Sequence, residues 1–346
     1  MRSRRANAEV VVVTGASAGV GRAVARRFAQ SGASLGLIAR DAAALQDTAR
    51  DIDALGGRAI AAPADVADAD AVLAAAERVA AAFGPIDVWV NAAMATVFSP
   101  LSEMSADEFR RVTEVTYLGY VHGTMAALRQ MRPRGRGTIV QVGSALAYRG
   151  IPLQSAYCGA KHAIRGFSDA VRSELLHDRS GVRLVMVQLP AINTPQFAWA
   201  RTHMQRQPRP MGTVFQPEAA ADAVFAAVRG RSREYWLGRT TLLTIIGNTV
   251  LPGLFDRMLA RTGIDGQQTG EPVSPDRQDN LDQPVPGLHR AHGTFDALAQ
   301  ERALLAPGPL ARLGVVALGA LAFVALGLAA RSIAPRGSAS LGHERN

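Results

Sequence analysis

The chain contains very little cysteine and few aromatic residues. Its single cysteine, Cys158, excludes an internal disulfide and any metal cluster built from several cysteines, and we expect no metal site. Aromatic residues make up only 5% of the 346 residues, which is little material for stacking on bases, and the arginines are scattered along the chain. Despite a formal net charge of +9, the sequence therefore predicts no nucleic-acid partner.

Lysine is almost absent as well. Of the 38 lysines and arginines, only Lys161 is a lysine, and a lysine is a compact charge whose pKa is more easily tuned than that of arginine. Apolar residues recur with a period near 3.6 over residues 154–177, which predicts a helix with Tyr157 and Lys161 one turn apart on one face. A nearby ammonium lowers the pKa of a phenol from about 10. We interpret the pair as an acid/base unit; the alternative is an ordinary surface pair.

A second pattern lies near the amino terminus. Val10–Val13 is typical of a buried parallel strand, Thr14–Gly21 is rich in glycine, and a helical pattern follows. Glycines allow the backbone to approach a pyrophosphate, whose charge the start of a helix attracts. A tight loop without a ligand is the alternative, but the order of strand, turn and helix favours a dinucleotide site.

Strands and helices alternate over the first 240 residues. The strands are expected at 34–39, 58–63, 87–90, 138–142, 182–189 and 235–237, and the helices at 42–55, 69–83, 105–131 and 154–177. This alternation predicts an α/β fold with a doubly wound parallel sheet, in which ligands bind beyond the carboxyl ends of the strands. Candidate residues follow six of the expected strands: Gly15, Arg40, Asp65, Asn91, Ser144 and Pro190.

Arg40 lies at or just past the end of the second expected strand. An acidic residue there would bind a ribose 2′-hydroxyl, whereas an arginine suits a 2′-phosphate. We therefore favour NADP(H) over NAD(H); a solvated arginine in a turn is the alternative.

Taken together and in this order, these motifs resemble the short-chain dehydrogenase/reductase family over about residues 9–240. The resemblance implies a Rossmann-type fold in which Tyr157 is the general acid/base, Lys161 tunes it and holds the nicotinamide ribose, and Ser144 binds the substrate oxygen. It implies contacts of Asp65 and Val66 with the adenine, and of Ile192 and Thr194 with the nicotinamide carboxamide. The further implied cofactor residues are Gly15, Ser17, Gly19, Val20, Gly21, Arg40, Asn91 and Pro190.

The chain departs from the family pattern at Thr116. Many members have an asparagine at the matching position of the long helix, where it relays protons through water to the lysine. A threonine hydroxyl offers one donor in place of two. Thr116 is the candidate for this relay.

The carboxyl-terminal third is not explained by the resemblance. Residues 240–261 are strongly apolar and broken at Pro252, which predicts two short helices or a bent one. They would form a lid on an apolar substrate pocket, contact a membrane surface or cover the sheet. Residues 264–308 resemble a linker or a loosely ordered strap. Leu313–Ala330 is an uncharged run of eighteen residues, interpreted as a membrane anchor, with a buried helix as the alternative.

These features divide the chain into five parts: a basic tail (1–8), a Rossmann-type catalytic domain (9–262), a linker or strap (263–309), a hydrophobic helix (310–331) and a polar tail (332–346). We expect an NADP(H)-dependent oxidoreductase acting on a lipophilic carbonyl or alcohol, attached to a membrane with its catalytic domain on the cytoplasmic side. The resemblance implies homo-oligomers. The alternative is a membrane-tethered scaffold that binds NADP(H) without turnover.

Overall fold

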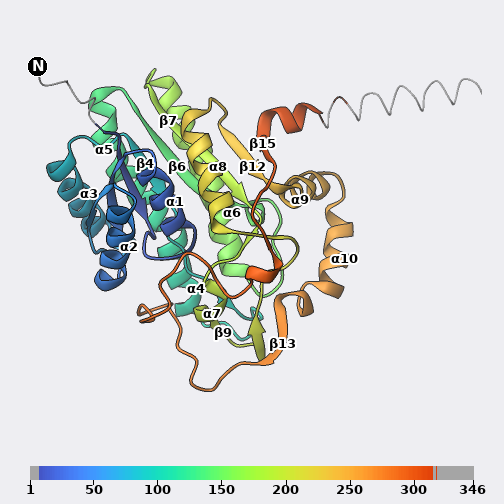
Figure 1. Cartoon of the computed structure of the whole chain (residues 1–346). Helices are drawn as coiled ribbons and strands as arrows, with labels where there is room; N and C mark the ends of the chain where they lie inside the picture. Colours follow the sequence, from blue (N-terminus) through green and yellow to red (C-terminus); the bar gives the residue numbers. More distant parts are fainter. Residues whose placement is uncertain (1–7, 315–316, 318–346) are drawn as a thin grey trace, which may run out of the picture.

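The centre of the molecule is an eight-stranded sheet (Figure 1). The computed structural model describes residues 8–314 and 317. The strand order is β15-β12-β7-β6-β4-β1-β2-β3; β15 is antiparallel to β12 and the other neighbours are parallel. The strands are β1 (Val10–Thr14), β2 (Ser34–Ile38), β3 (Arg58–Ala61), β4 (Val88–Asn91), β6 (Gly137–Ser144), β7 (Val182–Leu189), β12 (Glu234–Leu237) and β15 (Leu305–Pro307).

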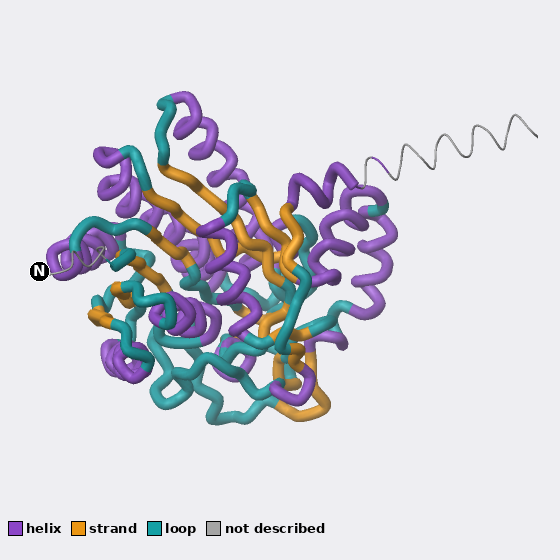
Figure 2. Tube along the Cα trace, turned by 45° about the horizontal axis from the view of Figure 1, so that its top comes forward, coloured by secondary structure: helices purple, strands orange, loops and turns teal. Residues whose placement is uncertain are grey.

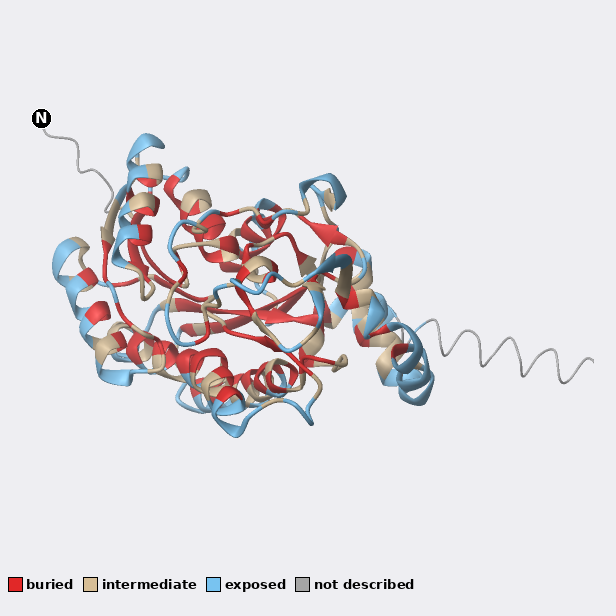
Figure 3. Ribbon diagram, turned by 90° about the horizontal axis from the view of Figure 1, so that it is seen from below, coloured by how far each residue is buried: buried red, intermediate tan, exposed pale blue. Residues whose placement is uncertain are grey.

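Helices cover both faces of this sheet (Figure 2). One face packs against α1 (Gly19–Ala29), α2 (Ala42–Ala54) and α8 (Pro217–Arg229). The other packs against α3 (Ala69–Phe83), α4 (Ala106–Thr113), α5 (Gly119–Met131) and α6 (Ser155–His177). In β1, Val11 and Val13 face the first layer, while Val10 and Val12 face the second. Both sides of the strand are therefore apolar, as a central parallel strand requires, and the buried residues gather along the sheet (Figure 3).

The chain order across the sheet reverses at β1. β1 pairs with β2 on one side and with β4 on the other, so the connections after β1 and β4 run in opposite directions. Such a reversal opens a crevice at the carboxyl ends of the strands. The predicted doubly wound α/β fold is confirmed, and with it the edge at which a ligand is expected.

The helix predicted over 105–131 is not continuous. Ser105 begins it with a capping box, in which the Glu108 amide donates to Ser105 Oγ and the Ser105 amide donates to Glu108 Oε2. A π-helical turn, η1 (Glu114–Leu118), then separates α4 from α5. The wider turn fits one more residue than an α-helix would, and hydrophobic periodicity does not reveal such an insertion.

Between residues 190 and 234 the sequence analysis predicts no element, and the structure contains several. The short ones are β8 (Ala191–Ile192), α7 (Gln196–Trp199), β9 (Arg201–Thr202), β10 (Arg206–Pro208) and β11 (Val214–Phe215), while β5 (Val97–Phe98) pairs with β9. Strands of two or three residues carry too few positions to show a period. The longer α8 does have a recognisable start, because Pro217 is its first residue.

The apolar run at 240–261 forms two helices, as its break at Pro252 predicts. They are α9 (Gly238–Val250) and α10 (Pro252–Thr262). Leu243, Val250 and Leu254 are exposed on them, whereas Ile245 and Leu259 are buried. The two helices therefore pack against the rest of the molecule along a narrow strip.

Residues 263–309 are not a loose linker. β13 (Gln268–Pro272) pairs with β10, β14 (Ala299–Gln300) pairs with β11, and β15 joins the main sheet. The segment crosses the carboxyl ends of the strands between α10 and β15 (Figure 1). The remaining short helices are η2 (Arg132–Arg134), η3 (Ala145–Ala147), η4 (Asp265–Gln267) and η5 (Asp296–Leu298).

The predicted membrane location requires correction. Within residues 8–314 and 317, no helix combines the length and the apolar character needed to cross a bilayer. The proposed anchor, residues 313–330, lies almost entirely outside the described residues. On this finding we withdraw the prediction of a membrane-associated protein.

Candidate functional site

One cavity of about 420 Å³ lies at the carboxyl ends of the strands. It is lined by nearly all the residues that the sequence predicts for the site: Gly15, Ser17, Gly19, Val20, Gly21, Arg40, Asp65, Val66, Ser144, Tyr157, Lys161, Pro190, Ile192 and Thr194. The two predicted residues that do not line it are Asn91 and Thr116. Positions spread over 180 residues of sequence thus meet at one place.

The turn after β1 requires glycine. Gly15 has a φ of 69°, and a Cβ there would lie 2.8 Å from Ala93 Cα. A Cβ on Gly21 would lie 2.2 Å from the Gly15 oxygen. Both positions exclude a larger residue, so the backbone itself forms this wall of the cavity. At the start of α1 the N-cap residue Ala18 provides no side-chain cap, and a helix start of this kind attracts an anion.

Ser144, Tyr157 and Lys161 face the same cavity from two elements. Ser144 ends β6, and Tyr157 and Lys161 lie one turn apart near the start of α6. The Lys161 ammonium donates to the Val142 carbonyl oxygen at 2.8 Å and to the Tyr120 hydroxyl at 3.1 Å. Its Nζ atom lies 5.5 Å from the centre of the Tyr157 ring. The predicted pair on one helical face is therefore present.

The pKa values in this site differ from the sequence-based expectation. Burial lowers the pKa of Lys161 to about 7. Burial also raises the pKa of Tyr157, and the neighbouring Cys158 adds to this increase, while a hydrogen bond with Ser144 opposes it. Lys161 is not among the causes of the pKa shift of Tyr157, so the structure does not support the prediction that it lowers this pKa. Loss of hydration dominates, because it disfavours both the phenolate and the ammonium.

Tyr120 is a site residue that the sequence analysis missed. Its hydroxyl donates to the Val142 oxygen at 2.9 Å and accepts from Lys161. The side chain is buried, and burial raises its pKa well above the ordinary value, so it remains a neutral partner of the amine. Tyr120 lies four residues after Thr116, about one helical turn further on. Because Thr116 was a candidate site residue, this spacing was the signal in the sequence that could have identified Tyr120 as a neighbour of Lys161.

The Thr116 hydroxyl forms hydrogen bonds outside the cavity. It donates to the Ala95 oxygen at 2.8 Å and accepts from the Ala95 amide at 2.9 Å. The side chain is fully buried and outside the cavity. Thr116 therefore fixes the loop after β4, and the structure does not bring it to Lys161 as a proton relay.

Asn91 is also structural. Its Nδ2 donates to Gln141 Oε1 at 2.9 Å, and its Oδ1 accepts from Trp89 Nε1 at 2.8 Å. It is completely buried between β4, β6 and α5. Asn91 therefore supports the central strand and does not face the cavity as the predicted cofactor residue would.

Arg40 and Asp65 lie at the ends of neighbouring strands and both have protein partners. The Arg40 guanidinium donates to the carbonyl oxygens of Asn280, Leu281 and Asp282. Asp65 accepts from the Ala67 amide and from Arg111. Burial favours a higher pKa for Asp65, but these two hydrogen bonds and the nearby arginine charges lower it overall. Arg40 is thus partly occupied by residues 280–282, which the sequence analysis did not anticipate.

The other end of the cavity is largely apolar. Its walls come from α7, α9, α10 and the loops near them, and they include Met94, Phe197, Met211, Thr240, Thr241, Thr244, Phe255, Met258 and Leu259. Arg149 holds α10 through Asp256 at 2.6 Å and α9 through Asn248 at 3.1 Å. Of the alternatives for residues 240–261, this placement matches a lid on the pocket.

Comparison with known proteins assigns the class. The model of the family described as short chain dehydrogenase matches residues 9–205, more than half of the chain. The protein therefore belongs to this family of oxidoreductases. It is 29% identical over 291 residues to the uncharacterized oxidoreductase YxnA of Bacillus subtilis (strain 168), which covers 84% of this chain and 82% of that protein.

Two solved structures are similar to this one. An alcohol dehydrogenase from the archaeon Thermococcus sibiricus, complexed with 5-hydroxy-NADP, is 29% identical with a TM-score of 0.58, over 66% of this chain and 95% of that chain. A metagenomic short-chain oxidoreductase in complex with NADP is 28% identical with a TM-score of 0.54, over 64% of this chain and 91% of that one. These likenesses support the fold.

Proposed function

We propose that this oxidoreductase uses NADP(H) to interconvert an apolar carbonyl compound and its alcohol, with Tyr157 as general acid/base. The observation that supports this proposal best is the shared cavity: Ser144, Tyr157 and Lys161 face the same space as the glycine turn after β1. The two neighbours bound to NADP or its derivative are consistent with the cofactor.

The residues present fit a dinucleotide phosphate. The glycine turn has no room for side chains, and the start of α1 lacks a side-chain cap. The Gly19 amide donates to the Arg290 carbonyl oxygen, and the amides that follow it in the first turn are suited to a pyrophosphate. Arg40 carries positive charge at the end of β2, where a 2′-phosphate is expected. When bound, the cofactor supplies or accepts the hydride.

The side chains of the site supply the proton. Because the pKa of Tyr157 is raised, its hydroxyl is protonated at neutral pH and ready to donate to a carbonyl oxygen. Ser144 would bind the same oxygen and hold it near the phenol. Lys161, with a pKa of about 7, exchanges protons readily at neutral pH and would stabilise the phenolate that remains.

The apolar walls indicate the substrate class. Phe255, Met258 and Leu259 of α10 form a surface suited to an aliphatic or aromatic group. We therefore expect turnover of apolar ketones or aldehydes to exceed that of small polar ones.

A direct assay tests this function. The purified chain is mixed with NADPH and a panel of apolar and polar carbonyl compounds, and the nicotinamide absorbance is followed. We expect turnover of apolar compounds, and a loss of about 10²-fold or more in Tyr157→Phe with NADPH affinity retained. Retained activity in Tyr157→Phe would remove the acid/base role. Tight NADPH binding without any turnover by the wild type would instead favour a nucleotide-binding scaffold.

A further inference from the structure

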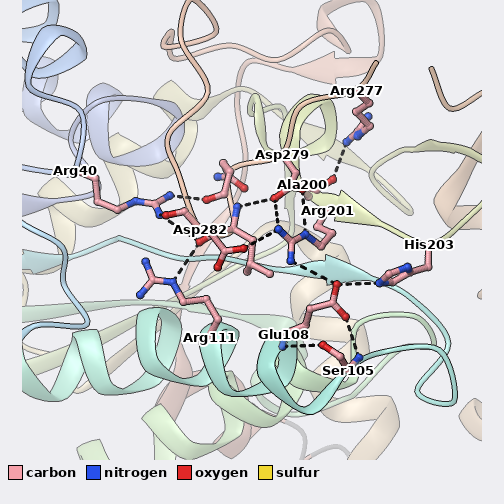
Figure 4. Close-up of polar contacts among 12 residues, drawn as sticks. Arg40, Ser105, Glu108, Arg111, Ala200, Arg201, His203, Arg277, Asp279 and Asp282 are labelled. Carbon is pink, nitrogen blue, oxygen red and sulfur yellow. Dashed lines mark hydrogen bonds and ion pairs between the residues drawn. The ribbon is translucent and has the colours of Figure 1, made fainter. Parts of the chain in front are cut away.

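Residues 277–293, here called the crossing segment, lie across the adenosine side of the cavity. They come from the part of the chain after α10, outside the span of the family match. Asn280, Pro284, Val285 and His289 of this segment line the cavity. Figure 4 shows the carboxyl-terminal stretch that includes Asp279 and Asp282 between arginines of other elements.

Two arginines hold the main chain of this segment. Arg40 donates to the carbonyl oxygens of Asn280 at 2.5 Å, Leu281 at 3.2 Å and Asp282 at 2.9 Å. Arg111 Nε donates to the same Leu281 oxygen at 3.2 Å (Figure 4). The residue expected at a 2′-phosphate is therefore also a contact that holds the segment closed.

Ion pairs and main-chain contacts hold the segment from the opposite side. Arg201 pairs with Asp279 at 3.0 Å and with Asp282 at 2.7 Å. Arg277 donates to the carbonyl oxygens of Phe197 at 3.1 Å and Ala200 at 2.9 Å. The segment is thus bound to both walls of the cavity, at Arg40 and at the region of α7 and β9.

The segment also reaches the glycine turn. The Gly19 amide donates to the Arg290 carbonyl oxygen at 2.9 Å, and Arg22 donates to the His289 oxygen at 2.7 Å. Leu281, Val285 and Ala291 are buried, with at most 6% of their surface exposed. One stretch of chain therefore spans from the expected 2′-phosphate position to the expected pyrophosphate position, and apolar side chains fix it there.

We propose that the crossing segment is a lid that has to detach before the dinucleotide can leave, so that it sets the rate of cofactor release. This inference rests on the proposed function. A ligand in the cavity beneath residues 280–290 is enclosed by chain that is bound at both ends. Before the ligand can leave, Leu281 has to come out of its buried position, and the crossing segment has to lose its contacts with Arg40 and Arg201.

The test measures release of NADPH from the whole chain. Wild type and Leu281→Asp are loaded with NADPH and mixed with excess NADP⁺, and nicotinamide fluorescence is followed by stopped flow. A carboxylate in place of the buried leucine disfavours closure, so we expect release to be at least about tenfold faster, equivalent to about 1.4 kcal/mol. Leu281→Met, which keeps the apolar contact, should release NADPH at nearly the wild-type rate. Leu298→Asp is the matched control, because Leu298 is 55% exposed in the same carboxyl-terminal region.

A second variant tests the lid in case Leu281→Asp does not fold. In Asp279→Asn/Asp282→Asn the side chains keep their size, and an asparagine at 279 can still accept from the Leu281 amide, but the charge pairs with Arg201 are lost. Faster release from this variant also supports the lid. Equal release rates in folded variants and wild type would overturn it, while the proposed function would stand. A wild type that binds neither NADPH nor NADH would overturn both.

Discussion

Lys161 shows how much the surroundings of one residue decide its chemistry. It is 2% exposed, and its Nζ is held by the Val142 oxygen and the Tyr120 hydroxyl. Neither of these groups is an anion, so burial lowers the pKa of the amine to about 7. An arginine would remain charged there, whereas this lysine can gain and lose a proton at neutral pH.

The first prediction is that the buried Lys161 amine makes the free energy of unfolding depend on pH. Between pH 7 and the ordinary pKa of 10.5, the unfolded chain holds a proton on Lys161 that the folded chain has lost. The free energy of unfolding therefore rises with pH in this window, by about 1 to 2 kcal/mol between pH 7 and 8.5. In Lys161→Met this increase should disappear. Urea denaturation of both proteins without cofactor at the two pH values measures the difference.

The upper limit of this pH window follows from Cys158. Burial raises the pKa of its thiol to about 11, so above about pH 9 the unfolded chain loses that proton first, and this effect cancels the gain from Lys161 and stops the rise in stability. Below pH 9 this opposite effect is small. Identical pH dependence in wild type and Lys161→Met would show that the amine is not deprotonated in the folded protein.

At the scale of elements, β4 and α5 depend on one buried polar network. A Cβ on Gly123 of α5 would lie 2.1 Å from Asn91 Oδ1, so the helix approaches the strand closely at this point. Asn91 bonds to Trp89 and Gln141, and Gln141 bonds to Thr124 of α5. The network therefore connects strand, neighbouring strand and helix behind the wall of the cavity.

Asn91→Ala should destabilise the fold without weakening cofactor binding. Trp89 Nε1 would lose its acceptor and Gln141 Oε1 would lose a donor in a site closed to water, which costs about 2–3 kcal/mol. Denaturant unfolding measures this loss, with the exposed Gln46→Ala as control. NADPH affinity of the folded variant should remain within about threefold of wild type, a change below 1 kcal/mol. A large loss of affinity at unchanged stability would return Asn91 to the cofactor residues.

Elements with strong local patterns could be predicted from the sequence. Residues 69–83 and 182–189 form the helix and the strand that were expected, because hydrophobic period, cap and β-branched run agree there. The π-helical turn at Glu114–Leu118 could not be predicted, since hydrophobic periodicity does not reveal one inserted residue and the contact of Thr116 with Ala95 is not local. The raised pKa of Tyr157 escaped prediction for a similar reason, because it depends on how much water the fold removes.

At the scale of the whole molecule, the part of the chain after residue 240 adds a strand to the main sheet and part of the wall to the cavity. Six of the predicted site residues follow strands, so topology alone gathers them at one edge of the sheet: Gly15, Arg40, Asp65, Asn91, Ser144 and Pro190. The crossing segment carries no such signal. It binds Arg40 through carbonyl oxygens that every residue has, at a separation of 240 residues or more along the chain. Contacts of this kind leave no pattern of side chains from which they could be predicted.

The end of the described chain is held to the sheet by a buried charge. Glu234 of β12 is 4% exposed, and its carboxylate accepts from Gln188, Tyr148 and Arg312. Arg312 Nη2 lies 2.7 Å from Glu234 Oε2, just beyond β15. Because Arg312 provides the only cationic partner of Glu234 among the described ion pairs, the carboxylate depends on the return of the chain to this edge of the sheet.

Arg312→Met should therefore destabilise the molecule by about 2 kcal/mol, because it leaves a buried carboxylate without its counter-ion. In Arg312→Met/Glu234→Gln, part of this loss should be recovered, since the neutral amide needs no cation. Thermal and urea unfolding of the two single variants, the double variant and the wild type give the coupling energy. A coupling near zero would mean that Gln188 and Tyr148 alone stabilise Glu234. In that case β15 would be held by its pairing with β12, without help from the arginine that follows it.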